Sequence, residues 1–324
     1  MTGHVTGHMT GQARTRVAVI GGGQNCEHEV SLASAASVAG ALDPAVYDVV
    51  TLTIGRDGTW RDRGQRPIGL SGAAQVLRGC DVVFPVVHGP RGEDGALAAL
   101  CELAGLPYVG SGIRPGALAM DKWATKLVAG ALGIPTAPGI LVAAASAAHL
   151  RWTHPVVVKP VSAGSSQGVT LVSSAEALRP ALDVALALDD RVLVEDVVVG
   201  REIDVAVLRC ADGTLVAAPA LEIVVDGLFD YEHKYGGHAD FRVPARLDEV
   251  DAKALEDAAL AAYDALGCAG VARIDFFLTE TGPVLNEVNT VPGMTEHSQV
   301  PRMFAAAGLS YPELLDELVR AAHR

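Results

Sequence analysis

The sequence predicts an α/β protein whose N-terminal part holds a parallel sheet, followed by a small β-rich part and a C-terminal part with a sheet of its own. Two observations predict this class. Within residues 16–112, short apolar runs alternate with small, apolar stretches of helical character, which is the order of strand–helix units in a parallel sheet. Further along, strand-like runs follow one another across polar or glycine-rich turns, as in antiparallel sheets.

The composition is that of a protein with a large core and an acidic surface. Half of the 324 residues are hydrophobic but only 5% are aromatic, so Ala, Val and Leu must build the core, and the 35 glycines suit many tight strand–helix turns. The length predicts two or three domains. The formal net charge of −13 argues against nucleic acid or an anionic membrane as the main partner, so an anionic ligand would need local Lys, Arg or metal ions.

The N-terminal residues and the cysteines favour a cytoplasmic protein. Residues 1–15 lack the apolar core of a signal peptide and are predicted to form a disordered tail, with Met9 an equally plausible start. No apolar run reaches membrane-spanning length. The five cysteines are odd in number, widely spaced and without a CxxC pair, which indicates free thiols in a reducing compartment.

Three segments are predicted, and each has its own order of elements. The N-terminal one, 16–112, has strands at 16–20, 46–54 and 81–87, with helices after the first and the third. The central one, 113–195, has helices at 121–132 and 175–188 and strands at 155–160, 168–174 and 191–196. The C-terminal one, 196–324, has strands at 202–209 and 214–224, a polar loop at 226–246, a helix at 250–266, strands at 272–279 and 283–290, and a closing helix.

The glycine run after the first strand is a candidate ligand loop. Dinucleotide binding would need G-x-G-x-x-G, and Cys26 occupies the third glycine position, so that fingerprint fails. An anion or a substrate at the following helix N-terminus remains open. The alternative reading, which the motif alone favours, is that Glu27 and Glu29 are simply acids at a helix start.

The segment HGPRGEDG, at 88–95, directly follows a strand. Loops at the C-terminal ends of parallel strands carry ligands, and a His, an Arg and two acids between glycines are unusual for a plain connection. A solvated turn in which Glu93 and Asp94 cap the next helix is an equally good reading.

The segment KPVSAGSSQG, at 159–168, has two readings that carry function. Its last five residues fit G-x-S-x-G with Ser166 as nucleophile, which would make the protein a serine hydrolase. That motif requires a helix after the serine, whereas VTLVSS is strand-like. A Gly/Ser loop between two antiparallel strands better fits a phosphate lid, to which Lys159 would add a point charge. A plain flexible hairpin is the third possibility.

The strongest pattern is a pair of strands joined by 279–282, in which Gly282 supplies the turn. Period-two alternation places Arg273 and Asp275 on one face, and Glu287 and Asn289 share a face by the same rule. An antiparallel hairpin brings these faces together. Two carboxylates and an amide are hard oxygen donors suited to Mg²⁺. The alternative, an ion pair on a solvated face, fits poorly with the apolar neighbours.

A Pro-Gly turn follows this hairpin, at 290–295. It could present a backbone N–H to a substrate beside the metal. An ordinary type II turn is the plain alternative.

Taken together and in order, these segments resemble the D-alanine–D-alanine ligases of the ATP-grasp superfamily, from Val17 to the C-terminus. One motif alone would be moderate evidence, but nine in sequence are highly specific. The matching segments are GGxxxEHEVS at 22–31, HGxxGEDG at 88–95, MDK at 120–122, KPxxxGSSxG at 159–168, VED at 194–196, GRE at 200–202, FDYEHKY at 229–235, RIDFF at 273–277 and NEVNTVPGMTEHS at 286–298.

The resemblance implies an ATP-grasp fold in which a central lid domain and a C-terminal domain hold ATP. It implies Lys122 and Lys159 as nucleotide-phosphate lysines, and Ser166 as a further ATP-binding residue in the lid. Glu195 and Glu202 match the acids of the adenine strand and of the ribose. The implied ligands of two Mg²⁺ or Mn²⁺ ions are Asp275, Glu287 and Asn289, and K⁺ is a further candidate cofactor.

The resemblance also implies roles around the two amino acids. Glu27 would receive the ammonium of the first D-alanine, and His88 would lie near its carboxylate. An oxyanion hole would consist of Arg273 and the N–H of Gly293. The second D-alanine would be held through its carboxylate by Ser298 and Lys234, and the link to Glu27 on loop closure would be made by Ser165 and Tyr235.

The implied reaction joins two D-alanines for peptidoglycan synthesis. The carboxylate of the first attacks the γ-phosphate of ATP, and the amine of the second attacks the resulting acyl phosphate, which lid closure protects from water. The family suggests a homodimer. Departures are Gln299 after Ser298, a short glycine-rich closing loop at 236–244, and Cys26 beside the substrate acid. They bear on the second substrate, although Tyr235 favours an amine.

Three alternatives remain beside this reading. A sibling ligase would use D-lactate, D-serine or another D-amino acid as the second substrate. A hydrolase would depend on Ser166 and not on ATP. A nucleotide sensor without catalysis would be expected to have lost metal ligands, whereas Asp275, Glu287 and Asn289 are all present.

Overall fold

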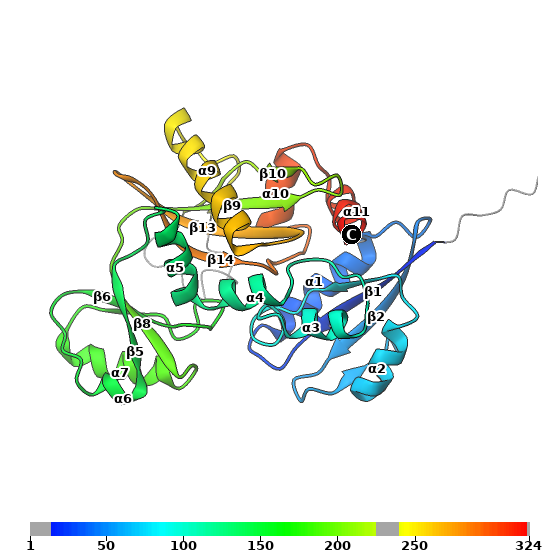
Figure 1. Cartoon of the computed structure of the whole chain (residues 1–324), viewed down its shortest axis with the longest axis horizontal. Coiled ribbons are helices and arrows are strands. Elements are labelled where there is room, and N and C mark those ends of the chain that lie inside the picture. Colours follow the sequence, from blue (N-terminus) through cyan, green and yellow to red (C-terminus); the bar gives the residue numbers. More distant parts are fainter. Residues whose placement is uncertain (1–13, 225–239, 323–324) are drawn as a thin grey trace, which may run out of the picture.

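The computed structural model describes residues 14–224 and 240–322, which form three sheets with helices packed around them (Figure 1). The predicted tail, except for its last residues, and most of the predicted polar loop lie outside the described residues. Among the described residues, no helix is long and apolar enough to cross a membrane. All five cysteines are free thiols.

The N-terminal sheet has the strand order β3-β2-β1-β4. As predicted from the strand–helix alternation, β1 is parallel to β2 and to β4, and only the short β3 is antiparallel. Its strands are β1 (Thr15–Gly22), β2 (Tyr47–Ile54), β3 (Trp60–Arg61) and β4 (Val82–Pro85). The helices of this part are α1 (His28–Ala41), α2 (Gly69–Leu77) and α3 (Ala96–Leu103).

The central sheet is small and antiparallel, with the order β5-β8-β6-β7. Its strands are β5 (Gly139–Ala143), β6 (Val156–Pro160), β7 (Thr170–Val172) and β8 (Arg191–Asp196), and its helices are α6 (Ala144–Ala147) and α7 (Ala175–Leu186). One face is buried against α7. The Gly/Ser loop connects β6 to β7, which are antiparallel neighbours, as the sequence predicts.

The third sheet has the order β12-β11-β9-β13-β14, with β10 on the edge of β9. Its strands are β9 (Arg201–Arg209), β10 (Leu215–Ala217), β11 (Leu221–Val224), β12 (Asp240–Arg242), β13 (Val271–Thr279) and β14 (Gly282–Asn289). The predicted hairpin of β13 and β14 is confirmed, and Gly282 takes a φ of 111° at its turn. One face of the sheet packs against α4 (Ile113–Met120), α5 (Lys122–Ala131) and α9 (Glu249–Leu266).

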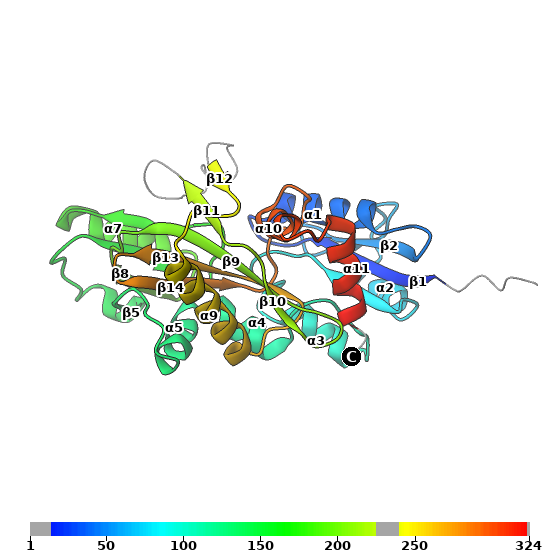
Figure 2. The same cartoon turned by 90° about the horizontal axis from the view of Figure 1, so that it is seen from above.

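The packing cuts across the predicted segment boundaries in two places. By their apolar contacts, α4 and α5 belong with the third sheet, although the boundary before residue 113 places them in the central segment. The last helices, α10 (Gln299–Ala306) and α11 (Tyr311–Ala321), share one core with β1, β4 and α1 of the N-terminal sheet. Figure 2 shows α11 beside that sheet. The division into three domains therefore stays a prediction, although each predicted segment contains one of the three sheets.

Some elements differ from those predicted. The predicted strand at 214–224 is two short strands, β10 and β11, because Pro219 interrupts the run. Several elements were not predicted, among them β3, α2, β5, α6, β12 and α10. α2 contains an internal glycine, Gly72, and β5 has no clear alternation of polar and apolar residues, so neither gave a strong pattern.

Candidate functional site

Two adjoining cavities lie where the three sheets meet. The first, of about 490 Å³, lies between α1, the 88–95 loop, the Gly/Ser loop and the hairpin. The second, of about 330 Å³, lies between the central sheet and the third sheet. Four residues line both cavities: Lys122, Ala163, Arg273 and Glu287. A group bound in one cavity can therefore reach a group bound in the other at this junction.

Glu27 is the acid of the first cavity. It precedes α1, is 7% exposed, and accepts a hydrogen bond from the Ser165 hydroxyl through Oε1. Its Oε2 is buried and has no hydrogen-bond partner among the described residues. A buried carboxylate oxygen without a partner is costly, so this position fits the ammonium group of a ligand.

Two glycines make room for this carboxylate. A Cβ added to Gly89 would lie 2.4 Å from Glu27 Oε2, and one added to Gly164 would lie 2.6 Å from it. Gly89 also has a φ of 71°. The glycines of HGPRGEDG and KPVSAGSSQG therefore let two backbones approach Glu27, which explains why they stand in these motifs.

The Gly/Ser loop is docked on the first cavity. Both Ser165 and Ser166 adopt left-handed conformations, with φ of 49° and 55°, which are unfavourable for serine and point to a functional constraint. Ser165 lines the first cavity and Ser166 the second. Strand β7 follows this loop, so the strand–serine–helix order of a hydrolase elbow is absent here.

The hairpin brings together the residues predicted from its alternation. In the observed register Asp275 is opposite Glu287, and Arg273 is opposite Asn289. The same row continues onto β9, where Asp204 is opposite Asp275. Three carboxylates thus stand in a line across three strands. Like charges opposite each other destabilise a sheet, so this row needs cations beside it.

Arg273 is the cation nearest to this row, and it is 9% exposed. Its Nε and Nη2 each donate to the Asp275 carboxylate at 2.7 Å, and Nε lies 3.4 Å from Asp204 Oδ2. Burial alone would lower the pKa of Arg273, but the carboxylates of Asp275 and Asp204 raise that pKa well above its ordinary value. The guanidinium is therefore permanently charged at the junction of the cavities.

Gln299 completes the contacts of this guanidinium. Its Oε1 accepts from Arg273 Nη1 at 2.6 Å, and its Nε2 donates to Asp204 Oδ2 at 2.8 Å. The residue singled out in the sequence as a departure from the family pattern thus joins Arg273 to the acid on β9.

We expect Gln299→Leu to lower kcat by about 10-fold, because it removes one of the contacts that orient Arg273. It should also lower stability by roughly 1–3 kcal/mol, because the buried Asp204 loses a donor. Steady-state kinetics and thermal unfolding measure the two effects. Gln75→Leu on the exposed side of α2 is a control that should change neither. A kcat for Gln299→Leu within twofold of wild type would contradict this role.

The lysines predicted for the nucleotide line the second cavity. Lys159 Nζ lies 2.6 Å from Glu195 Oε2, and Lys122 Nζ lies 3.2 Å from Glu287 Oε2. Lys126, which belongs to none of the sequence motifs, lies 2.5 Å from the other oxygen of Glu195. Burial raises the pKa of Glu195, but Lys159 and Lys126 outweigh it and hold that pKa below its usual range. The spacing of four residues from Lys122 on α5 was the available signal for Lys126.

The two acids of the 88–95 motif have different roles. Asp94 accepts hydrogen bonds from the Arg91 and Ala96 backbone N–H groups, so it stabilises the start of α3 as one reading proposed. Glu93 instead lines the first cavity. Burial, with a further contribution from the Glu27 charge, raises the pKa of Glu93 to about 8. Glu93 therefore lines the site, although its place in the sequence indicated only a helix start.

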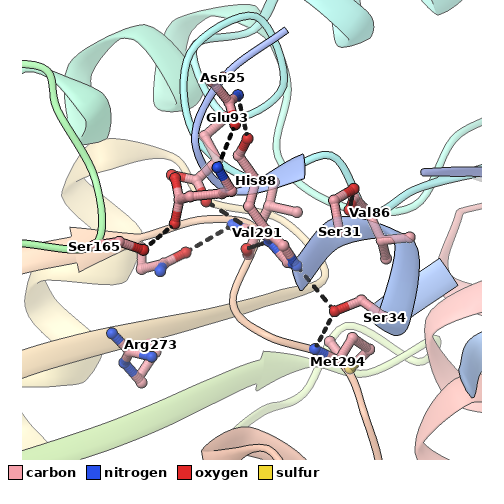
Figure 3. Close-up of polar contacts among 12 residues, drawn as sticks. Asn25, Ser31, Ser34, Val86, His88, Glu93, Ser165, Arg273, Val291 and Met294 are labelled. Atoms are coloured by element: carbon pink, nitrogen blue, oxygen red, sulfur yellow. Dashed lines mark hydrogen bonds and ion pairs between the residues drawn. The ribbon is translucent and has the colours of Figure 1, made fainter. Parts of the chain in front are cut away.

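His88 is 3% exposed and lines the first cavity (Figure 3). Its Nδ1 lies 2.7 Å from the Val291 carbonyl oxygen, and its Nε2 lies 2.9 Å from Ser34 Oγ. Both ring nitrogens therefore contact protein groups. Its predicted place near a substrate carboxylate stays a prediction.

The Pro-Gly segment forms one wall of the first cavity. Gly293 lines the cavity together with Ser298, and a Cβ on Gly293 would lie 3.2 Å from Ser298 Oγ. Ser298 Oγ also accepts from the Thr295 N–H at 3.1 Å. The described structure thus places the predicted residues Gly293 and Ser298 side by side with Arg273 in one cavity.

The remaining predicted residues divide into two groups. Glu202 and Glu195 line the second cavity, and Asn289 lines the first. Lys234 and Tyr235 lie outside the described residues.

The predicted metal ligands have a donor set suited to Mg²⁺. Within residues 14–224 and 240–322, no group of three or more His, Cys, Asp and Glu side chains is placed to hold an ion. The predicted set consists of two acids, Asp275 and Glu287, and one amide, Asn289. Asp275 forms an ion pair with Arg273, and Glu287 forms one with Lys122. Hard oxygen donors from Asp275 and Glu287 at the mouth of a lysine-lined cavity fit a divalent ion that also binds phosphate oxygens.

Comparison with known families matches nearly the whole chain. The family model described as the D-ala D-ala ligase C-terminus matches residues 135–320, and the model of the D-ala D-ala ligase N-terminus matches residues 16–72 and 65–111. The chain belongs to the D-alanine–D-alanine ligase family. The resemblance seen in the sequence is thereby confirmed, and with it the ATP-grasp fold.

Relatives of this ligase family are similar over their full length. The D-alanine–D-alanine ligase of Mycolicibacterium vanbaalenii is 40% identical, covering 96% of this chain and 97% of its own. That of Mycobacterium tuberculosis is 40% identical, covering 95% of each. The VanG D-Ala:D-Ser ligase of Enterococcus faecalis superposes with a TM-score of 0.84 at 34% identity, covering 96% and 100%. The D-alanine–D-alanine ligase of Coxiella burnetii gives a TM-score of 0.80 at 32% identity, covering 96% and 94%.

Proposed function

We propose that this protein joins two D-alanine molecules into D-alanyl-D-alanine at the expense of ATP, supplying a precursor of peptidoglycan. The observation that carries the proposal is the junction of the two cavities at Lys122, Arg273 and Glu287. One cavity offers an unpaired buried carboxylate oxygen to an ammonium group, and the other offers lysines to phosphates. Membership of the family gives the chemistry that such a junction serves.

The chemistry follows from the charges of the reacting groups. A carboxylate is a poor electrophile, so that of the first D-alanine attacks the γ-phosphate of ATP, and ADP leaves. The amine of the second D-alanine then attacks the acyl carbon, loses a proton, and the phosphate leaves. Arg273 and the Gly293 N–H would stabilise the oxyanion of this step. Glu27 would hold the ammonium of the first D-alanine. Ser165, which is hydrogen-bonded to Glu27, would help to exclude water.

The residues around the nucleotide have matching roles in this proposal. Lys122 and Lys159 would bind phosphate oxygens, Ser166 would contact them from the lid, and Glu195 and Glu202 would contact adenosine. Asp275, Glu287 and Asn289 would hold two Mg²⁺ or Mn²⁺ ions. Bound ions of this kind would neutralise the crowded phosphate oxygens.

The second amino acid is the least defined part of the site. Ser298 would bind its carboxylate together with Lys234, and Tyr235 would join Ser165 in the link to Glu27 on loop closure. One structural relative is titled a D-Ala:D-Ser ligase, and Gln299 lies in the same cavity, so D-serine is the second candidate for this position.

The first test is phosphate release from Mg·ATP by the purified protein. D-Alanine, L-alanine, D-serine and D-lactate are added singly and each together with D-alanine, and product masses are read from the same tubes. We expect release that requires D-alanine and yields its dipeptide.

Other outcomes assign the protein differently. A mixed product without the D-alanine dipeptide would give the protein a sibling specificity. No turnover with any of these compounds would contradict the ligase proposal. Ester cleavage without ATP that disappears in Ser166→Ala would make it a hydrolase.

Three finer features belong to the same proposal: a homodimer, a cytoplasmic location and stimulation by K⁺. Sedimentation analysis of the purified protein and a potassium titration of the phosphate-release assay test the first and the third, and cell fractionation tests the second.

A further inference from the structure

A chain of buried hydrogen bonds connects helix α1 to the Pro-Gly segment (Figure 3). Ser34 lies on α1 and is fully buried. Its hydroxyl lies 2.9 Å from His88 Nε2 and accepts from the Met294 N–H at 3.2 Å. His88 Nδ1 lies 2.7 Å from the Val291 oxygen. We call Ser34 and His88, with these contacts, the α1 relay.

The direction of each bond in the relay can be worked out. A carbonyl oxygen only accepts, so His88 Nδ1 must carry the hydrogen that points to Val291. Burial lowers the pKa of His88, although the Glu27 charge opposes it, so the ring is neutral and its Nε2 has no hydrogen. The Ser34 hydroxyl therefore donates to Nε2, and its oxygen is left to accept from the Met294 N–H.

One competing arrangement exists. His88 Nδ1 also lies 3.9 Å from the Glu93 carboxylate, and an ion pair with Glu93 would require a protonated ring. In that case Nε2 would carry a hydrogen and donate to Ser34, so the direction of one bond would be reversed. The two arrangements differ in the tautomer and charge of His88, which can be measured.

The relay contacts the backbone on both sides of Gly293. Val291 is held through its oxygen and Met294 through its N–H, and the Met294 oxygen accepts from the Tyr311 hydroxyl at 2.6 Å. Gly293 itself lines the first cavity. The backbone on either side of Gly293 is therefore held by side chains that are distant in the sequence.

We propose that Ser34 is a positioning residue that, through His88, fixes the Gly293 N–H for the acyl-transfer step, an inference that rests on the proposed function. α1 begins just after Glu27, so a single rigid helix would set the distance between the substrate ammonium and the oxyanion donor. Fixed donors stabilise a developing charge without having to reorganise.

The chain offers a matched control on the same helix. Ser31 is also fully buried, and it also bridges two backbone groups: it accepts from the Gly22 N–H at 2.8 Å and donates to the Val86 oxygen at 2.6 Å. Neither group belongs to the Pro-Gly segment. A general loss of stability should therefore appear in both serine variants, and a loss of positioning only in one.

The kinetic test compares Ser34→Ala with Ser31→Ala in the full-length protein. We expect Ser34→Ala to lower kcat by roughly 10- to 100-fold with the KM for ATP unchanged, since a misplaced donor loses much of its effect. We expect Ser31→Ala to lower the unfolding temperature comparably while kcat stays within about threefold, because its partners lie outside the acyl-transfer site. An equal loss of kcat in both variants would overturn the proposal.

A measurement without turnover tests the relay itself. In ¹⁵N-histidine NMR of the wild-type protein at pH 7, with the His88 signals assigned through His88→Gln, we expect a neutral ring with its hydrogen on Nδ1. A protonated ring or the Nε2–H tautomer would overturn the relay even in an active enzyme. Absence of ATP turnover in the wild-type protein would instead count against the proposed function, so the two failures are distinguishable.

Discussion

In its proposed role as an oxyanion donor, Arg273 is expected to be sensitive to replacement: Arg273→Lys should lower kcat by roughly 10²–10³-fold, the usual effect of removing one such donor. Lysine keeps the positive charge but cannot bind the Asp275 carboxylate with two parallel N–H groups, as Arg273 does at 2.7 Å. It also leaves Gln299 without its donor. Phosphate release and dipeptide formation, measured at saturating ATP and D-alanine, give the change in kcat.

The lysine replacement is preferred to alanine because the site is buried. Removing the cation would leave the Asp204 and Asp275 carboxylates opposite each other with no positive charge between them. This would lower the free energy of unfolding by about 3–5 kcal/mol, which is enough to unfold a marginally stable protein. Arg201→Lys is the matched control, since Arg201 pairs with Glu222 at 2.8 Å outside both cavities. A kcat for Arg273→Lys within fivefold of the control would mean that Arg273 takes no part in the reaction.

If Glu287 is a metal ligand as proposed, Glu287→Gln is expected to lower kcat by about 10³-fold at any Mg²⁺ concentration, since a bound ion contributes several kcal/mol to stabilising the charge that develops. The change is isosteric, and the oxygen of the new amide would still accept from Lys122, so the fold should persist. The measurement is ATP turnover titrated with MgCl₂, together with thermal unfolding.

The control for this variant lies on the same sheet. Glu222 is 7% exposed and faces Arg201 much as Glu287 faces Lys122, but it lines neither cavity. Glu222→Gln should therefore affect stability and not the dependence on Mg²⁺. Glu287→Gln with wild-type Mg²⁺ dependence and turnover within tenfold would mean that the hairpin holds no catalytic ion.

The hairpin could be predicted because the residues that determine its strands and its turn lie close together in the sequence. A period of two fixes which side chains of one strand share a face, and Gly282 fixes the turn, so the hairpin itself follows from the two strands. The pairing of Asp275 with Glu287 also needs a shift of register between Asp275 and Phe276, which neither signal predicts, because a regular ladder would place Asp275 opposite Asn286. The Gly/Ser loop was predictable for the same reason, since strand-like runs flank it on both sides.

The remaining site residues depend on tertiary packing. Glu93 is a helix-start acid by its position in the sequence, and the cavity that it lines forms only when the Gly/Ser loop and the hairpin pack against the N-terminal sheet. Asp204 is one of several polar residues on β9, and only the register with β13 adds it to the row of acids. Ser34 contacts groups 54 and 260 residues away, a distance over which no local pattern carries information.

The core shared by the first strand and the last helix links the two ends of the chain. Val17 and Val19 of β1 are packed in the same cluster as Leu314 and Leu318 of α11. While the protein is being synthesised, that face of the N-terminal sheet therefore lacks part of its covering until the final helix leaves the ribosome. A polypeptide that ends before α11 would therefore retain an exposed apolar surface, which makes an incompletely folded chain prone to aggregate.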